Sequence, residues 1–462
     1  MLNRISSILF LNSIFQNVKN KRGLKILKYN KKLQYKLNIT MQNFKAYEIM
    51  KEFNKKYNVY IGDIDDKELN FARKNIGNEG FRELLKIKLE RLNSLGLSNN
   101  EIDNINELEK AYFIELKKLD ISENKISDIN ILEKVKFTKL EDLDLSHNQI
   151  SKINILENVN FKELRKLDLS NNIISDIEVF SKVDFKKLNI LNLSNNNISD
   201  INILGRVNFF ELVKLDLSYN SISNINILDK VNFPLLKILI LKFNNITDIN
   251  VLEKVKFDKL EELDLVNNKI LDIKVLEKVN FKELKYLNLK NNNISDINVL
   301  EKVTFDKLEI LDLENNMIKD INIFKKVNFK QLKELYLKNN IISDIEVLER
   351  VKFKKLKKID LVDDKNIINN LSDINLNYSK QDIEQKHNIE NKYKTEVGLK
   401  AMTLEKIQSG ESKTMININK GKITYIENKD NNNINSTNYI PFSCIPQLER
   451  IDQSFFYSQI QE

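Results

Sequence analysis

Several residue types that commonly build cross-links or catalytic sites are scarce in this sequence of 462 residues. It contains one cysteine, two histidines, three prolines, nine glycines and no tryptophan. A disulfide needs two thiols, and Cys444 is the single cysteine, so no disulfide can form within the chain. We therefore expect a reducing, cytoplasmic location. No stretch reaches the roughly 20 apolar residues that a membrane-spanning helix requires, so no membrane span is predicted.

The shortage of histidine and cysteine also argues against catalysis and metal binding. His147 and His387 lie far apart in the sequence, and Cys444 has no neighbouring histidine that would activate it. The sequence contains neither a glycine-rich phosphate-binding loop nor a spaced set of Cys and His ligands. We therefore predict that the protein is not an enzyme and has no catalytic residue, no cofactor and no metal site.

The positive charge is confined to one end of the chain. The net charge is +8, yet residues 1–60 hold 13 lysine and arginine residues against two glutamates, so the remainder is slightly acidic. This basic segment could contact nucleic-acid phosphates non-specifically, but it carries no recognised nucleic-acid-binding motif. Lysines on helix surfaces explain its charge more simply, and no nucleic-acid partner is predicted.

The clearest feature that is present is an internal repeat of 24 residues, which runs from Leu92 to about Leu361 without an insertion. Alternation of leucine with polar residues, as at Leu143 and Leu145, predicts one short strand with one buried face in each copy. The second half of each copy predicts a short helical turn, in which Asn130 and Glu133 form a candidate capping pair. Stacked copies would then form a parallel sheet.

An asparagine follows the strand in each copy up to Asn340 and is predicted to be structural, whereas the last copy has Asp364 at this position. A buried side-chain amide is costly unless its hydrogen bonds are made, so we expect it to bond the turn backbone and the adjacent coil. A phenylalanine column, including Phe161 and Phe185, is expected to pack inside. The predicted asparagine ladder comprises Asn124, Asn148, Asn172, Asn196, Asn220, Asn244, Asn268, Asn292, Asn316 and Asn340.

The pattern L-x-x-L-x-L-x-x-N-x-I, as in Leu140 to Ile150, resembles the leucine-rich-repeat family. The continuation Ile198-Ser-Asp-Ile-Asn-Ile-Leu204 resembles the phosphatase-regulator class and the bacterial internalins, whose repeats are usually shorter. This resemblance implies an α/β repeat solenoid: a horseshoe with a parallel concave β-sheet and short helical turns on the convex side. It also implies that the protein binds other proteins.

The two ends of the chain depart from the repeat, which divides the sequence into three predicted parts. Residues 1–62 are interpreted as a helical N-terminal cap or an F-box-like module, and residues 63–374 as the solenoid. Residues 375–462 are interpreted as a low-complexity tail, because most of them are polar. Within this tail, strand alternation around a glycine turn predicts a hairpin at 414–427.

The F-box resemblance rests on apolar residues that include Ile14, Phe15 and Leu27. In that family a three-helix module binds an adaptor of a ubiquitin ligase, and the following repeats select the substrate. This sequence lacks the usual leading Leu-Pro and the aromatic residue after the basic pair Lys31-Lys32. A plain helical cap and a targeting peptide stay open as alternatives.

The residues that point outward from the predicted sheet suggest where a partner binds. The position between the two strand leucines is mainly aspartate, which we interpret either as repeat consensus or as an acidic track for a basic partner. The copy around Leu236–Asn244 replaces these polar residues with apolar ones, predicted to be exposed, and such residues in a charged surround are typical of interfaces. The candidate partner-binding residues are Tyr219, Ile238, Ile240, Phe243, Tyr286 and Tyr336.

These observations predict a monomeric scaffold or receptor that binds a partner protein on the concave face of the repeat array. Two alternatives stay open. The chain could be an F-box-like substrate receptor of a ubiquitin ligase, or a regulatory subunit of an enzyme such as a phosphatase.

Overall fold

The computed structural model describes residue 31 and residues 41–63, 65–345, 347–348, 351, 353–361, 415–419, 422–426 and 440–441. The chain divides into two compact units, Met1–Asn375 and Leu376–Glu462. The residues that carry the F-box resemblance, apart from Lys31, lie outside the described residues, as do His387 and Cys444.

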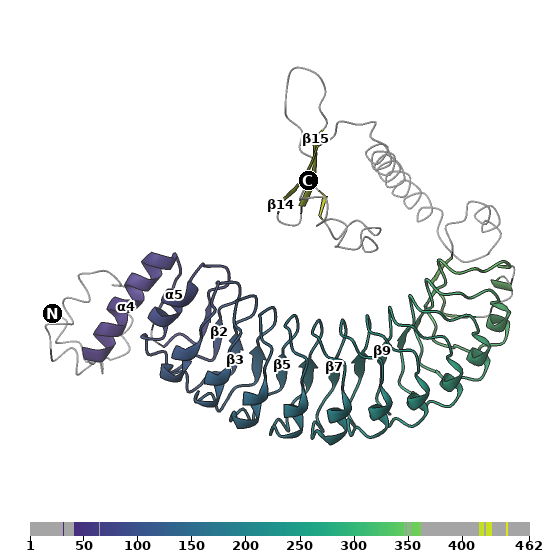
Figure 1. Cartoon of the computed structure of the whole chain (residues 1–462), viewed down its shortest axis with the longest axis horizontal. Helices are drawn as coiled ribbons and strands as arrows, with labels where there is room; N and C mark the ends of the chain where they lie inside the picture. Colours follow the sequence, from purple (N-terminus) through teal and green to yellow (C-terminus); the bar gives the residue numbers. More distant parts are fainter. Residues whose placement is uncertain are drawn as a thin grey trace, which may run out of the picture. The chain divides into compact units, whose positions relative to one another are not determined.

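The first unit is built on a single parallel sheet in which each strand pairs with the next one along the chain (Figure 1). Leu143 lies beside Leu167, its equivalent 24 residues later, and the same register holds from β2 to β13, whereas β1 pairs with β2 over 26 residues. A shift of one residue would turn every strand leucine outward, so burial of the leucines determines the register. Among the described residues the strands are β1 (Glu68–Asn70), β2 (Ser94–Gly96), β3 (Lys118–Asp120), β4 (Asp142–Asp144), β5 (Lys166–Asp168), β6 (Ile190–Asn192), β7 (Lys214–Asp216), β8 (Ile238–Ile240), β9 (Glu262–Asp264), β10 (Tyr286–Asn288), β11 (Ile310–Asp312), β12 (Glu334–Tyr336) and β13 (Lys358–Asp360).

From β2 to β12 each strand is joined to the next through a short 3-10 helix, and these helices follow the convex edge of the curved array in Figure 1. The predicted solenoid with a parallel sheet and helical turns is therefore confirmed. The predicted Asn130–Glu133 cap is wrong, because Asp128 Oδ1 accepts the N–H of Asn130 at 2.8 Å instead. The 3-10 helices are η2 (Asn106–Lys110), η3 (Asn130–Glu133), η4 (Asn154–Asn158), η5 (Glu178–Ser181), η6 (Asn202–Arg206), η7 (Asn226–Asp229), η8 (Asn250–Glu253), η9 (Lys274–Glu277), η10 (Asn298–Glu301) and η11 (Asn322–Lys325).

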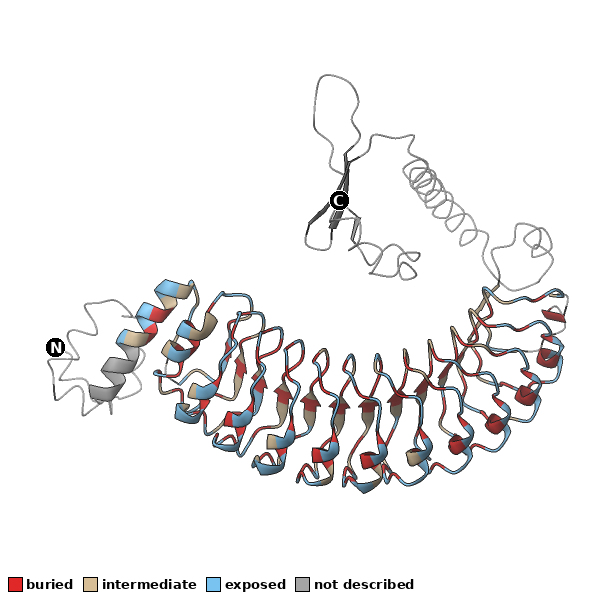
Figure 2. Cartoon of the chain, in the orientation of Figure 1, coloured by how far each residue is buried: buried red, intermediate tan, exposed pale blue. Residues whose placement is uncertain are grey.

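The core runs continuously between the sheet and the 3-10 helices. Figure 2 shows that buried residues recur in every coil, on the strands and on the helical turns. Strand leucines such as Leu143 and Leu145 are fully buried, and the phenylalanine column, which includes Phe161 and Phe185, is buried with them. Because each coil covers the next, no single repeat could bury these side chains alone.

The ladder asparagines join neighbouring coils, as Asn148 illustrates. Its Oδ1 accepts the N–H of Ile126 in the preceding coil at 2.9 Å. Its Nδ2 donates to the carbonyls of Ile121, Leu145 and Ser146, each at 3.1 Å. One side chain thus makes the hydrogen bonds that backbone groups of two coils need, at a turn where the regular hydrogen bonds of the sheet end.

The N-terminal end of the core is covered by helix α4 (Met41–Tyr57), which lies beside helix α5 (Gly77–Leu84) (Figure 1). Phe53 of α4 is buried, with its ring centroid 4.8 Å from that of Tyr57 and 5.8 Å from that of Phe71. None of the described helices is long and apolar enough to cross a lipid bilayer.

In the second unit, the described residues form three short strands. Strand β14 (Met415–Asn419) pairs antiparallel with β15 (Lys422–Ile426), and Asn419 lies opposite Lys422. Strand β16 (Ile440–Pro441) pairs with the other edge of β15. The β14–β15 pair occupies the segment for which the sequence predicted a hairpin.

Candidate functional site

The structure places the candidate residues Ile238 and Ile240 on the outward-pointing face of strand β8. Ile238 lies between Lys214 and Glu262 of the flanking strands, and Ile240 lies between Asp216 and Asp264. The prediction that Ile240 is exposed is wrong, since only 8% of its surface is accessible. Strands about 4.8 Å apart bring side chains against it from both sides, so Ile240 forms the floor of this face.

Tyr219 and Phe243 form a stacked aromatic pair at the carboxyl ends of β7 and β8. Their ring centroids are 4.1 Å apart and their planes differ by 11°. Tyr219 is 44% exposed, and the ammonium of Lys242 lies 5.8 Å from the centroid of its ring. The pair therefore presents a flat aromatic surface beyond the carboxyl end of β8, the strand that carries Ile238 and Ile240.

Both aromatic residues adopt a left-handed backbone conformation, with φ of 53° at Tyr219 and 54° at Phe243. The same position in the flanking repeats holds Asn195 and Asn267, whose φ is 52° in each case. Asparagine tolerates this conformation, whereas a bulky residue pays roughly 1–2 kcal/mol for it. His147 occupies the equivalent position in an earlier repeat and is exposed, away from any described catalytic partner.

The two other candidate tyrosines lie further along the sheet. Tyr286 is on β10, two strands and roughly 10 Å from Ile238, with Glu262 between them. Its hydroxyl accepts a hydrogen bond from Asn288 Nδ2 at 2.6 Å, and burial raises its pKa to about 12. Tyr336 is on β12 and does not join the cluster around β8.

The environment of Tyr336 is made by neighbouring polar groups. Its hydroxyl donates to Glu334, a hydrogen bond that, together with burial, raises the pKa of Tyr336 to about 12. The ammonium of Lys358 lies 4.4 Å from the centroid of its ring. These contacts hold the ring within its own polar network on the face.

Two apolar residues of this face were missed in the sequence. Ile310 lies directly beside Tyr286, and Ile190 lies beside Lys214, both at the sheet position that Ile238 occupies. The signal was available, because the position before the first strand leucine of L-x-L repeats every 24 residues. Ile190 and Ile310 stand at this position, whereas the acidic column lies at the position between the two leucines.

The aspartates between the strand leucines serve the turns that follow the strands. Asp144 Oδ1, for example, accepts the N–H of Ser146 at 3.1 Å and its hydroxyl at 2.6 Å. This pairing explains aspartate as a consensus residue. The same Asp–Ser pair occurs at Asp120, Asp144, Asp168 and Asp216.

Asp312 allows a test of how burial changes the pKa of an aspartate that lies between the two strand leucines. Burial raises its pKa to about 6, above the value of the unfolded chain, so its ionisation disfavours folding as the pH rises through 6. We expect Asp312→Asn to stabilise the array by about 1–2 kcal/mol at pH 8 and to change little at pH 4. Asn288, at the equivalent position, keeps the turn hydrogen bond, to the N–H of Lys290 at 3.0 Å.

Urea unfolding of both proteins between pH 4 and 8 measures this effect. Asp296→Asn is the control, because that exposed aspartate also accepts a turn N–H, from Asn298 at 2.9 Å. A stability difference for Asp312→Asn that does not vary with pH would contradict the assignment.

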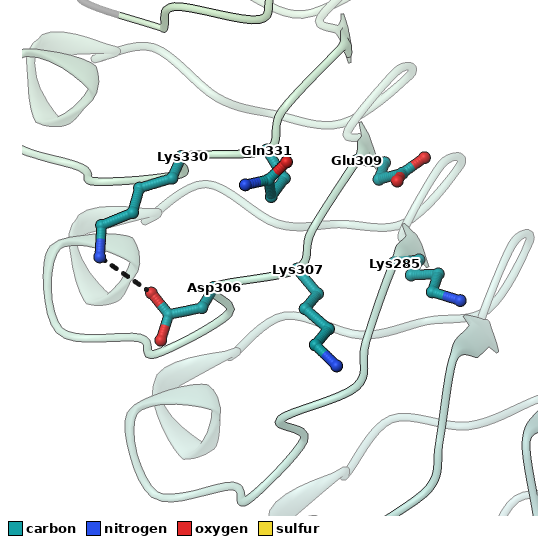
Figure 3. Close-up of a pocket in the computed structure, with 6 residues that line it drawn as sticks. All are labelled: Lys285, Asp306, Lys307, Glu309, Lys330 and Gln331. Carbon is teal, nitrogen blue, oxygen red and sulfur yellow. Dashed lines mark hydrogen bonds and ion pairs between the residues drawn. The ribbon is translucent and has the colours of Figure 1, made fainter.

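A shallow hollow lies at the amino ends of β10 to β12. Figure 3 shows its lining side chains, which come from successive coils, with Lys330 directed toward Asp306. Ion pairs with neighbouring coils occupy its lysines, as between Lys307 and Glu283. Among the described residues no group of three or more His, Cys, Asp or Glu could hold a metal ion. The hollow is lined by Lys285, Asp306, Lys307, Glu309, Lys330 and Gln331.

Comparison with known proteins supports the repeat assignment. The family model described as leucine-rich repeats (2 copies) matches residues 114–158, 162–206, 258–302, 282–326 and 306–350. No curated protein matches the sequence.

Solved structures resemble the repeat array. An internalin from Listeria monocytogenes is 26% identical, with 71% of this chain and 92% of that chain covered and a TM-score of 0.57. A leucine-rich-repeat protein from Leptospira interrogans is 24% identical, with 60% and 74% covered and a TM-score of 0.47. The family-model matches, the 24-residue coils and the asparagine ladder show that the array is built of leucine-rich repeats, as the similar internalin is.

Proposed function

We propose that this protein binds a partner protein on the face of its sheet, at a surface formed by Tyr219, Ile238, Ile240 and Phe243. We call these four residues the β8 surface. Leucine-rich-repeat architecture serves in general as a scaffold for protein binding. The location of the β8 surface on this array is supported by the exposure and the backbone conformation of its own residues.

The observation that carries the proposal is the stacked pair at left-handed backbone positions. Two successive repeats replace a well-tolerated asparagine by an aromatic residue, although the exchange strains the backbone at Tyr219 and Phe243. The strain does not place Tyr219 in the core, since 44% of its surface stays exposed. An exposed aromatic surface that costs folding energy is accounted for if a partner covers it.

Ile240 has a different part in this proposal from Tyr219 and Phe243. Since it is 8% exposed, it supplies an apolar floor and adds little area for a partner to bury. A charged substitution there would stand between Asp216 and Asp264 and would damage the fold itself. The aromatic pair is therefore the better target for testing binding.

The test is the double variant Tyr219→Asn/Phe243→Asn, which restores the residue of the flanking repeats. Relief of backbone strain offsets the lost ring stacking, so we expect the unfolding free energy to stay within about 1 kcal/mol. Loss of two aromatic anchors should weaken binding of the captured partner by roughly 100-fold or more. Affinity capture identifies the partner, and surface plasmon resonance with the purified partner gives the two dissociation constants.

Ile173→Asn is the matched control. Ile173 is 52% exposed and lies outside the β8 surface, so its replacement removes exposed apolar area without touching the proposed site. We expect unchanged affinity for this variant. If the folded double variant captured the partner as tightly as the original protein, the β8 surface would not be the binding site.

The ubiquitin-ligase and phosphatase alternatives gain no support of their own. The residues that carry the F-box resemblance lie outside the described part of the chain, apart from Lys31. The repeat array is compatible with a regulatory subunit, but no described residue favours that use over a general scaffold. The binding surface is therefore proposed without either assignment.

A further inference from the structure

Two aspartates on the same face as the β8 surface, Asp264 on β9 and Asp312 on β11, lack among the described residues the hydroxyl donor that others in their column have. Position i+2 is serine after Asp144 and Asp216, whereas it is Val266 after Asp264 and Glu314 after Asp312. Asp264 and Asp312 each accept only the backbone N–H of that residue, at 3.1 and 2.9 Å. Each carboxylate therefore has hydrogen-bonding capacity that its own turn does not use.

The amide between these two carboxylates does not compensate for the missing donors. Asn288 lies between Asp264 and Asp312 in the register of the sheet. Its Nδ2 donates to the Tyr286 hydroxyl at 2.6 Å, and its Oδ1 accepts the N–H of Lys290. The equivalent Asn192, which has no tyrosine at this distance along its strand, donates to its neighbour Asp168 at 3.0 Å.

No cation of the described chain replaces the missing donors either. None of the described lysine or arginine nitrogens comes within ion-pair distance of Asp264 or Asp312, although Lys290 is nearby and pairs with Glu314 at 2.9 Å. Asp264 is 8% exposed, and burial raises the pKa of both carboxyl groups. The charges of Lys242 and Lys290 offset the effect of burial in part, but neither lysine pairs with these carboxylates, so an external cation in direct contact would reduce the remaining cost of burial.

Each of these carboxylates has an apolar side chain nearby on the same face. Asp264 lies directly beside Ile240 of the β8 surface, and Asp312 lies on β11 with Ile310. We propose that the partner directs arginine or lysine side chains at Asp264 and Asp312, next to apolar residues that cover Ile238 and the aromatic pair. This inference rests on the proposed function, because it names the chemistry of the partner that the β8 surface binds.

The same arrangement disfavours other occupants. The two carboxylates are two strands apart, roughly 10 Å, which is too far for one metal ion at ordinary metal–oxygen distances. A nucleic acid would bring phosphates against Asp216, Glu262 and Asp264. A protein segment that combines basic and apolar side chains fits both the charge and the apolar floor.

The experiment selects peptides from a phage-displayed library of random 12-residue sequences on the full-length protein, in buffer with EDTA. We expect the enriched peptides to pair an arginine or lysine with aromatic or aliphatic residues. Synthetic copies should bind the Asp264→Asn/Asp312→Asn variant roughly 10-fold to 100-fold more weakly, the range for lost charge-assisted hydrogen bonds. Binding to the original protein should also weaken as salt rises.

Asparagine is chosen because Asn192 and Asn288 already occupy this column and still accept the turn N–H, so the variant should fold. Asp120→Asn/Asp168→Asn, in the part of the column with serine donors, is the control and should bind as the original does. Circular dichroism confirms the fold of both variants.

Each other outcome counts against one of the two proposals. Peptides that lack basic residues, equal affinity for the Asp264→Asn/Asp312→Asn variant, or no enrichment over a resin without protein would overturn the basic-partner inference. If such peptides still lost affinity for Tyr219→Asn/Phe243→Asn, the proposed function would stand. If the peptides bound that aromatic variant normally, the β8 surface itself would be wrong.

Discussion

Replacing Asn148 by aspartate is expected to lower the unfolding free energy of the array by about 3–5 kcal/mol. The substitution keeps the shape and the acceptor for the N–H of Ile126 but removes the Nδ2 donor. A carboxylate oxygen would then face three carbonyls, those of Ile121, Leu145 and Ser146, which now accept from Nδ2 at 3.1 Å. The buried carbonyls lose their donor, and a negative charge is added beside them.

Urea unfolding followed by circular dichroism measures this loss, and Asn340→Asp is the matched control. Asn340 makes the same set of contacts near the last repeats, including those to Leu313 and Leu337 carbonyls at 2.9 Å, but it is only partly buried. Water can solvate the new charge there, so we expect a loss of less than half as much. Equal losses of unfolding free energy at both positions would show that burial does not determine how much a ladder asparagine stabilises the array.

Replacing Phe53 by alanine is expected to cost about 3–5 kcal/mol at the N-terminal end of the array. Phe53 is 1% exposed and packs between Tyr57 of its own helix and Phe71 of the first repeat. The cavity would loosen α4 from the end of the core, and a repeat array needs its end covered. The loss should therefore appear as local opening near β1 and β2, before the central repeats unfold.

Hydrogen exchange read by mass spectrometry separates local from global opening. The N–H of Phe71 and that of Leu97 both donate to the neighbouring coil, at 2.8 and 2.7 Å, and should exchange faster in Phe53→Ala. Glu52→Ala is the control, because Glu52 is exposed on the same helix. Unaltered exchange in β1 and β2 would mean that α4 does not protect this end.

The repeat made the architecture predictable from sequence to an unusual degree. When every coil has 24 residues, the main contacts of a residue are with its equivalents 24 positions away, as Leu143 with Leu167 shows. The strands, their order and register, and the buried phenylalanines all follow from that single spacing. Even the asparagine contacts could be anticipated, since a buried amide must be satisfied by nearby backbone.

The properties of the candidate surface could not be obtained in this way, because they depend on how different side chains meet across strands. Ile240 occupies an outward-pointing position, yet its neighbours cover it to 8% exposure. The strain at Tyr219 and Phe243 is a property of the backbone turn, where φ is positive. Neither feature is part of the periodic pattern that the sequence displays.

The sequence by itself thus determined the leucine-rich repeat and the buried columns of this protein, since periodic contacts need only periodic residues. The tertiary structure alone decided which outward residues are covered, which aromatic rings stack and which carboxylates lack a donor. Asn288 shows the reason: whether its amide serves an aspartate or the Tyr286 hydroxyl depends on distances of a few ångströms between neighbouring side chains. Those distances are set by the packed coils and by no single repeat.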